Sequence, residues 1–342
     1  MAALHCADKG ANIGLMREGV MAVARILSWL ALLLLVSPAS AQDDYPNRPI
    51  RVIVPVGPGA GIDTAARITA TAAEPILGGK FVIENKPGAS MRIGASLAAR
   101  SAPDGYTLLF TAPAPIVASQ FIPPKLDFDP VNDFRPLVIG MFQPVLLIVR
   151  PSLGVRSVDE FVAYAKRNPG KISFGVQGIG GEMHLTLEHF KKTAGVDITH
   201  VPYNSGAQAI IDLLADRLDA MFLVIPPIKQ HVESGKLWAL ATLNEKRVQA
   251  LPNIPTIAEL GRPEMTNAIW FGYLAPAKTP DAVFGKLAKA FEALKSDAAL
   301  SARVTEMGAE LSMARPSEFR KIIESDRARY GKIVAEGNFA KE

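Results

Sequence analysis

The chain has 342 residues, of which 49% are hydrophobic and 20% are charged, a balance typical of a soluble globular protein of one or two domains. Its formal net charge is +4, and no basic tract concentrates that charge, which argues against a nucleic-acid partner. The single cysteine, Cys6, lies in the N-terminal segment described next. The rest of the chain therefore excludes disulfides, a cysteine nucleophile and a thiolate metal site.

The N-terminal segment has the pattern of a secretory signal peptide. Arg25 precedes an apolar run of eleven residues, 26–36, and Pro38-Ala39-Ser40-Ala41 follows with small residues where a signal peptidase cleaves. A membrane anchor is the alternative, but a span needs about 20 apolar residues. We expect cleavage after Ala41, a mature periplasmic chain from Gln42, and a true start at Met21.

Short apolar strands alternate with amphipathic helices along the mature chain, which predicts an α/β fold with mainly parallel sheets flanked by helices. Strands are expected at 50–55, 81–84, 106–111, 137–139, 145–149, 172–176, 220–224, 237–242 and 270–275. Helices are expected at 62–77, 93–101, 158–168, 183–194, 207–215, 280–296 and 317–336.

A glycine-rich loop, Gly57-Pro58-Gly59-Ala60-Gly61-Ile62-Asp63, joins the first strand to the first helix. Glycines let a ligand approach the backbone, and a helix N-terminus offers unpaired N–H groups that suit a carboxylate or phosphate. The loop does not match a nucleotide-binding motif, because Ile62 replaces the last glycine of G-x-G-x-x-G. A tight turn with Asp63 as an ordinary first-turn acid is the other interpretation, and both stay open.

A second such loop, Gly178-Ile179-Gly180-Gly181-Glu182, also follows a strand and opens a helix. Open α/β sheets bind ligands beyond the carboxyl ends of their strands. Two sheets facing each other would offer two glycine-lined helix starts to one small ligand.

The helix after this loop carries His184, Glu188 and His189. Their H-x-x-x-E-H spacing misses the zinc-protease motifs by position. We therefore expect no metal site here, and His184 is expected to pack or cap in the first turns of the helix. No G-x-S-x-G elbow or paired carboxylates indicate catalysis, and no cofactor is expected.

The mature chain carries an ordered series of short motifs. These are Tyr45-Pro46-Asn47-Arg48-Pro49-Ile50, the Pro55–Asp63 loop, Glu84-Asn85-Lys86-Pro87-Gly88-Ala89, Ala102-Pro103-Asp104-Gly105-Tyr106-Thr107-Leu108, His200-Val201-Pro202-Tyr203, Leu251-Pro252-Asn253-Ile254-Pro255-Thr256 and Trp270-Phe271-Gly272-Tyr273-Leu274-Ala275-Pro276. With this series the chain resembles the substrate-binding receptors of tripartite tricarboxylate transporters, the Bug receptor family.

The resemblance implies a two-lobed type II periplasmic binding protein, or Venus flytrap, that closes on its ligand by a hinge motion. We expect the chain to cross between lobes near 143–145 and 267–270. Lobe one would then comprise residues 42–144 with 268–342, and lobe two residues 145–267. The ligand-binding residues that we nominate are Gly57, Gly59, Ala60, Gly61, Asp63, Met91, Arg92, Ala112, Gln177, Gly180, Gly181, Glu182, Tyr203, Asn204 and Leu223.

Several of these positions depart from the family pattern. Glu182 stands where a small hydroxyl residue is common, Ser90-Met91-Arg92 replaces a glycine-rich stretch, and Leu223 stands where an acid is frequent. Glu182 could pair with Arg92, accept a hydrogen bond from a ligand, or face solvent. Met91 and Leu223 favour a more apolar ligand, either aromatic or branched.

The implied function is capture of a small carboxylated compound and its delivery to membrane transporter subunits, by a monomeric, non-catalytic receptor. A ligand-sensing role with a membrane kinase and an exported α/β enzyme are the alternatives. The sequence favours the receptor over the enzyme because it lacks a catalytic constellation.

Overall fold

In the computed structural model, residues 44–177, 181–203 and 205–336 are described. The compact body comprises Pro46–Glu342. The predicted signal peptide and its cleavage site lie outside the described residues. Among the helices of the described part, none has both the length and the apolar character that a membrane span needs.

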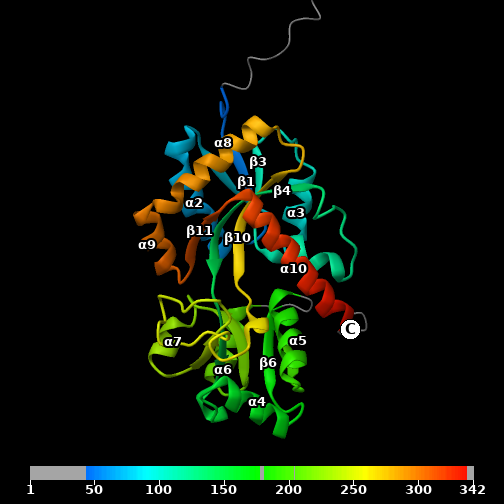
Figure 1. Cartoon of the computed structure of the whole chain (residues 1–342), viewed down its shortest axis with the longest axis vertical. Helices are drawn as coiled ribbons and strands as arrows, with labels where there is room; N and C mark the ends of the chain where they lie inside the picture. The colour runs from blue at the N-terminus through cyan, green and yellow to red at the C-terminus, as the bar shows by residue number, and fades with distance from the viewer. Residues whose placement is uncertain (1–43, 178–180, 204, 337–342) are drawn as a thin grey trace, which may run out of the picture. The chain divides into compact units, whose positions relative to one another are not determined.

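The first sheet has six strands in the order β11-β4-β10-β3-β1-β2. Its strands are β1 (Ile50–Val54), β2 (Phe81–Asn85), β3 (Thr107–Thr111), β4 (Phe134–Gln143), β10 (Ile269–Pro276) and β11 (Glu310–Ala314). All of them except β2 are labelled in Figure 1. Helices α2 (Gly61–Leu77), α8 (Asp281–Glu292) and α9 (Ala298–Glu306) pack together beside it. A second group comprises α3 (Arg92–Ala99), a π-helical turn (Ala114–Ala118) and α10 (Pro316–Glu336).

The second sheet has five strands in the order β7-β6-β8-β5-β9. Its strands are β5 (Val145–Val149), β6 (Ser173–Gln177), β7 (Thr199–Tyr203), β8 (Ala220–Val224) and β9 (Trp238–Thr242). Its helices are α4 (Val158–Arg167), α5 (Glu182–Ala194), α6 (Gly206–Leu214) and α7 (Lys229–Glu233). Short 3₁₀ turns lie at Ser119–Phe121, Pro151–Leu153, Pro263–Met265 and Ala293–Ser296.

The α/β architecture with two sheets flanked by helices is confirmed, but the expectation of mainly parallel sheets is wrong. β1 pairs in parallel with β2 and β3, and β6 with β7 and β8. β10 and β11 pair antiparallel in the first sheet, and β5 pairs antiparallel with β8 and β9 in the second. β4 leads the chain out of the first sheet and β10 leads it back, so their directions oppose.

The chain passes between the sheets at two places. Only Pro144 separates the end of β4 from the start of β5. The return runs through residues 243–268, after β9 and before β10. Both passages leave strands other than the parallel strands β1, β3 and β6, so the loops at the carboxyl ends of those parallel strands are free to carry a site.

The core of the first sheet is built around Trp270, which is fully buried. Its ring stacks edge-on against Phe319 of α10, with ring centroids 4.8 Å apart. Ile139 and Leu274 belong to the same buried cluster. Fully burying a side chain such as Phe319 contributes about 1.5–3 kcal/mol. This contact therefore helps to hold α10 against the sheet.

Candidate ligand-binding site

The loop before α2 leaves open space beside its backbone. A Cβ atom added at Gly57, Gly59 or Gly61 would meet no other heavy atom within 4 Å. Gly59 has a φ of +82°, which a residue with a side chain rarely adopts. Ala60 is the N-cap of α2 and has no side-chain oxygen to accept from the first turn. The unpaired N–H groups of this helix start are therefore available to a ligand.

The Asp63 side chain holds this loop in place through hydrogen bonds. Its carboxylate accepts hydrogen bonds from the Gly59 backbone N–H at 2.9 Å, the Arg67 Nε at 3.0 Å and the Asn85 Nδ2 at 2.9 Å. Asn85 also donates to the Val56 carbonyl at 3.0 Å. Burial alone would raise the pKa of Asp63, but these hydrogen bonds and the Arg67 charge lower it overall. Asp63 is 2% exposed, so its role in the described contacts is to hold the loop.

The segment before α3 holds three consecutive residues in left-handed backbone. Ala89, Ser90 and Met91 have φ values of 46°, 52° and 72°. The Met91 sulfur lies 4.0 Å from the Thr111 hydroxyl at the end of β3, next to buried Ala112. Arg92 donates to the carbonyls of Ile122 and Pro124 at 3.1 and 2.9 Å, and burial lowers its pKa. Its guanidinium is thus engaged with backbone, and its Nε is buried without a partner among the described atoms.

In the second sheet, three nominated residues lie at the carboxyl ends of neighbouring strands. Gln177 ends β6, and buried Leu223 lies near the end of β8. A Cβ atom added at Gly206, which opens α6, would lie 2.8 Å from the Gln177 amide and 3.6 Å from Leu223. The Tyr203 hydroxyl donates to Asp212 at 2.8 Å, and burial together with this bond raises the pKa of Tyr203 to about 12. Gly180 and Asn204 lie outside the described residues.

Helix α5, like α2, begins without a side-chain cap, because its N-cap is Gly181. By contrast, α4, α6 and α9 begin at Ser157, Ser205 and Asp297, whose side chains accept from the first turn. Such a cap typically stabilises a helix by about 1 kcal/mol. Helices α3, α7 and α8 also begin without a side-chain cap, at Met91, Ile228 and Pro280. What distinguishes α2 and α5 is that each uncapped start follows a glycine-rich loop.

Glu182, the first residue of α5, turns away from solvent and is 8% exposed. Its Oε1 accepts a hydrogen bond from the Tyr330 hydroxyl of α10 at 3.1 Å. Burial raises the pKa of Glu182 to about 8, with the nearby Asp326 adding to the rise. Neither the proposed pairing with Arg92 nor the solvent-facing orientation is found, because Arg92 bonds to backbone and Glu182 is buried.

A polar network continues from this contact. Arg329 donates to Asp326 at 2.8 Å, to Asn267 at 2.9 Å and to the Thr266 carbonyl at 2.9 Å. Asn267 donates in turn to the Thr186 hydroxyl of α5 at 2.6 Å. The network joins α5, the return segment and α10, three parts of the chain that the sequence does not mark as related. No sequence motif identifies Tyr330, Arg329 or Asp326 as partners of Glu182, so the sequence analysis missed them.

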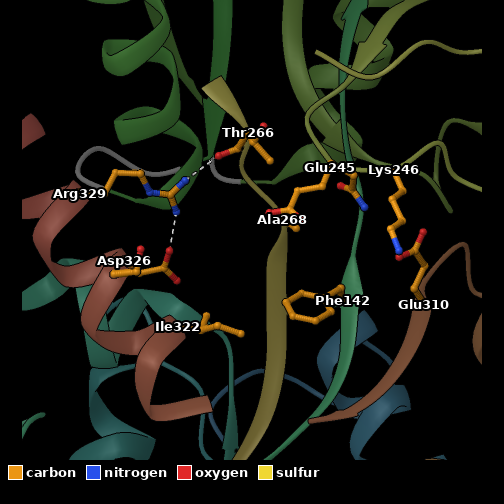
Figure 2. A pocket seen from close by; sticks show the side chains of 11 residues that line it. Phe142, Glu245, Lys246, Thr266, Ala268, Glu310, Ile322, Asp326 and Arg329 are labelled. Carbon is orange, nitrogen blue, oxygen red and sulfur yellow. Dashed lines mark hydrogen bonds and ion pairs between the residues drawn. The ribbon is translucent and has the colours of Figure 1, made fainter. Parts of the chain in front are cut away.

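A pocket of about 520 Å³ lies next to this network (Figure 2). It is lined by the end of β4, by the segment just before β10, by α10, by the start of β11 and by the loop after β9. Figure 2 shows Arg329 reaching from α10 toward Thr266, with Phe142 beside the pocket. Three acids and two bases line it, namely Glu245, Glu310 and Asp326 with Lys246 and Arg329. None of the nominated ligand residues lines this pocket.

Comparison with known proteins identifies the family. Residues 65–339 match the model of the tripartite tricarboxylate transporter family receptor. The chain is 34% identical to Protein BugT of Bordetella pertussis over 322 residues, which is 92% of this chain and 98% of that protein.

Solved structures are similar over most of the chain. One, described as R. palustris Rpa4515 with adipate, is 33% identical with a TM-score of 0.75 and covers 85% of this chain and 98% of its own. Another, MatC (Rpa3494) from Rhodopseudomonas palustris with bound malate, is 27% identical with a TM-score of 0.72 and covers 85% and 100%. The chain therefore belongs to the tripartite tricarboxylate transporter receptor family, also called the Bug family.

Proposed function

We propose that this protein is a periplasmic, non-catalytic receptor that captures a small carboxylated compound and delivers it to a tripartite tricarboxylate-type membrane transporter. The observation that carries the proposal is the pair of uncapped helix starts, α2 after Gly57–Ala60 and α5 after Gly181. Each follows a strand that ends at the same edge as its parallel neighbours, where α/β proteins bind ligands. Each offers unpaired N–H groups and the positive end of the helix dipole.

The chemistry of Glu182 supports a carboxylated ligand in spite of its acidic side chain. A pKa of about 8 keeps most of this carboxyl neutral at pH 7. A neutral acid at the start of α5 does not repel a ligand carboxylate as an ionised one would. Of the three roles considered for Glu182, contact with a ligand donor is the one that stays open.

The side chains near the loops favour a ligand with an apolar body. Leu223 and Ala112 are buried, and Met91 is half-buried beside Thr111. The related structures hold adipate and malate, which are dicarboxylates with short carbon chains. We therefore propose a carboxylate whose chain or ring packs against these three residues.

We propose lobe boundaries that follow the strands of the two sheets. Lobe one comprises residues 42–144 with 268–342 and lobe two residues 145–267, because the strands of each sheet fall within these ranges. We also propose that the receptor acts as a monomer. A sensor kinase in place of the transporter is the alternative partner, and recovery of membrane partners with and without ligand distinguishes the two.

The test is a thermal-shift screen of the mature chain from Gln42 against dicarboxylates, aromatic and branched acids, amino acids and neutral amides. A ligand at a hundredfold excess over its dissociation constant stabilises the folded state by about 2.7 kcal/mol, a shift of several degrees. A carboxylate that raises the melting temperature supports the proposal. Stabilisation by amides or amines alone contradicts the proposed ligand class.

Two glycine variants then locate the site. Gly57→Ala adds a methyl group into open space at an ordinary φ, so folding should be unaffected while ligand affinity falls. Gly59→Ala meets a φ of +82° and should lower the melting temperature as well. Unchanged affinity in Gly57→Ala would place the ligand away from this loop.

A further inference from the structure

We propose that His184, Glu188 and His200 form a binding site for a divalent transition-metal ion of the zinc class. The first two residues lie one turn apart on α5, and His200 lies on the edge strand β7. One ligand atom from each residue can be chosen so that all three lie within 4.8 Å of one another. The His184 Nε2 and Glu188 Oε1 atoms are 3.9 Å apart.

The arrangement is already close to that of a metal centre. Ligand atoms around tetrahedral zinc lie about 3.3 Å apart, given metal–ligand distances of about 2.0–2.2 Å. To reach that spacing from 3.9–4.8 Å, the side chains of Glu188 and His200, which are both half-buried, would rotate toward each other. The centroids of the two imidazole rings are 4.6 Å apart, and the ring planes are inclined at 58°. The His200 ring therefore lies next to the side of α5 that carries His184.

The donor set matches the chemistry of this class of ion. Two imidazoles and one carboxylate are a recurrent zinc ligand set, and a water completes the coordination. Each imidazole binds the metal through one nitrogen, while its other nitrogen keeps a hydrogen bond that orients the ring. His184 is 2% exposed, which supplies a rigid, desolvated side to the site.

Lys191 competes with the ion for the Glu188 carboxylate. Lys191 donates to the Glu188 Oε1 at 2.8 Å. A metal ion either displaces this ammonium group or uses the other carboxylate oxygen. Removing the Lys191 charge should therefore leave binding unchanged or strengthen it.

The structure also explains why the helix sequence alone excludes such a site. The H-x-x-x-E-H spacing fits no zinc motif. His189 is not part of the site, because its Nε2 lies 2.8 Å from the Glu264 carbonyl. The third donor comes from β7, eleven residues after His189 in the sequence. The site depends on the packing of α5 beside the parallel pair β6 and β7, which no local pattern reveals.

The test is titration of the untagged mature chain with Zn²⁺ and with Co²⁺, because a histidine tag would itself bind both ions. Calorimetry with Zn²⁺ should show one site, and Co²⁺ should give the intense visible absorption of a tetrahedral complex. Zn²⁺ should also raise the melting temperature. These measurements need no organic ligand, so their failure is distinguishable from failure of the receptor proposal.

Variants assign the site. Glu188→Gln and His200→Gln should each weaken Zn²⁺ binding about tenfold or more and abolish the Co²⁺ spectrum. His189→Gln, one residue from Glu188, is the matched control and should bind normally, as should Lys191→Met. A melting transition without metal that equals that of the wild type shows that each variant is folded. Absence of Zn²⁺ binding in the wild type, or equal loss in His189→Gln, overturns the proposal.

Discussion

The Tyr330 hydroxyl donates to the Glu182 carboxyl at 3.1 Å, although 148 positions separate the two residues in the sequence. Tyr330 lies on the last helix, α10, and Glu182 opens α5 beside the second sheet. This bond links helices that belong to different sheets. Since both side chains are buried, the bond lies in a desolvated environment where protonation of Glu182 controls its energy.

Replacing Glu182 with glutamine should flatten the dependence of stability on pH. The folded protein keeps a proton on Glu182 up to about pH 8, whereas the unfolded chain loses it near pH 4.5. The contribution of Glu182 to stability is thus fully present below about pH 4.5 and is lost as the pH rises to about 8. Melting temperatures of the wild type and Glu182→Gln from pH 4.5 to 8.5 should diverge in favour of the variant at the alkaline end.

Asp326 provides the control for this measurement. Burial raises its pKa too, against the opposing effects of Arg329 and Trp270. The stability of Glu182→Gln should therefore still fall as the pH rises, but less steeply than that of the wild type. The double variant with Asp326→Asn should show a weaker dependence on pH again. Parallel curves for wild type and Glu182→Gln would show that Glu182 is ionised in the folded protein.

Replacing Arg329 with methionine should destabilise the protein by about 3 kcal/mol, because it leaves the Asp326 carboxyl, whose side chain is only 14% exposed, without its cation. It also removes the donors to Thr266 and Asn267. The exposed pair Arg48–Asp104, with side chains 61% and 41% exposed, is the comparison, and Arg48→Met should cost less than about 1 kcal/mol. Urea unfolding measures both, and equal losses would show that the network adds no stability.

Asp63→Asn should lower both stability and ligand affinity. The variant loses one of the two carboxylate oxygens that accept from Gly59, Arg67 and Asn85, at a cost of about 2 kcal/mol. The pKa of Asp63 is lowered from 3.8 in the folded protein. The loss of stability in Asp63→Asn should therefore be largest at neutral pH and should shrink as the pH falls below about 4.

A matched variant separates this effect from a generic loss of charge. Asp159 also lies in the first turn of a helix, but its side chain is 76% exposed in its pair with Arg262. Asp159→Asn should change stability by less than about 1 kcal/mol and leave ligand affinity alone. If the two variants behave alike, Asp63 does not brace the loop.

The same substitution should have opposite effects at two alanines. Ala89 is exposed with a φ of 46°, a conformation that costs a residue with a side chain about 1–2 kcal/mol. Ala89→Gly relieves that cost and should raise stability by up to about 1 kcal/mol, after the greater chain entropy of glycine is subtracted. Ala302 is exposed inside α9, and Ala302→Gly should lower stability by about 1 kcal/mol. Chemical unfolding of both variants measures the change in the free energy of unfolding. A lower stability of Ala89→Gly would show that the backbone at Ala89 is not strained.

The sequence predicts the elements whose hydrophobic pattern is strong. The β5 and β8 strands match their expected bounds, since both are continuous apolar runs, and α2 begins one residue before its expected start. β7 was missed because it is an edge strand with exposed residues and a proline, Pro202, next to its last residue. β11 was missed as a half-buried edge strand, and α7 was missed because it has only five residues. α9 (Ala298–Glu306) was missed as well.

The site was less accessible to prediction than the fold. The glycine-rich loops could be located because they need glycine for reasons that are local to the backbone. The surroundings of Glu182 could not, because its partner Tyr330 and its neighbour Asp326 come from a distant helix. Whether neighbouring strands pair in parallel or antiparallel could not be predicted either, because an apolar run pairs equally well in both orientations.

The single residue between β4 and β5 limits how the two sheets can move. Consecutive Cα atoms are 3.8 Å apart, so Gln143 and Val145 stay within about 7.6 Å of each other in every conformation. Pro144 locks one of the few torsions available at this joint. Any rotation of one sheet against the other must therefore have its axis close to Pro144, and displacement grows in proportion to distance from that pivot.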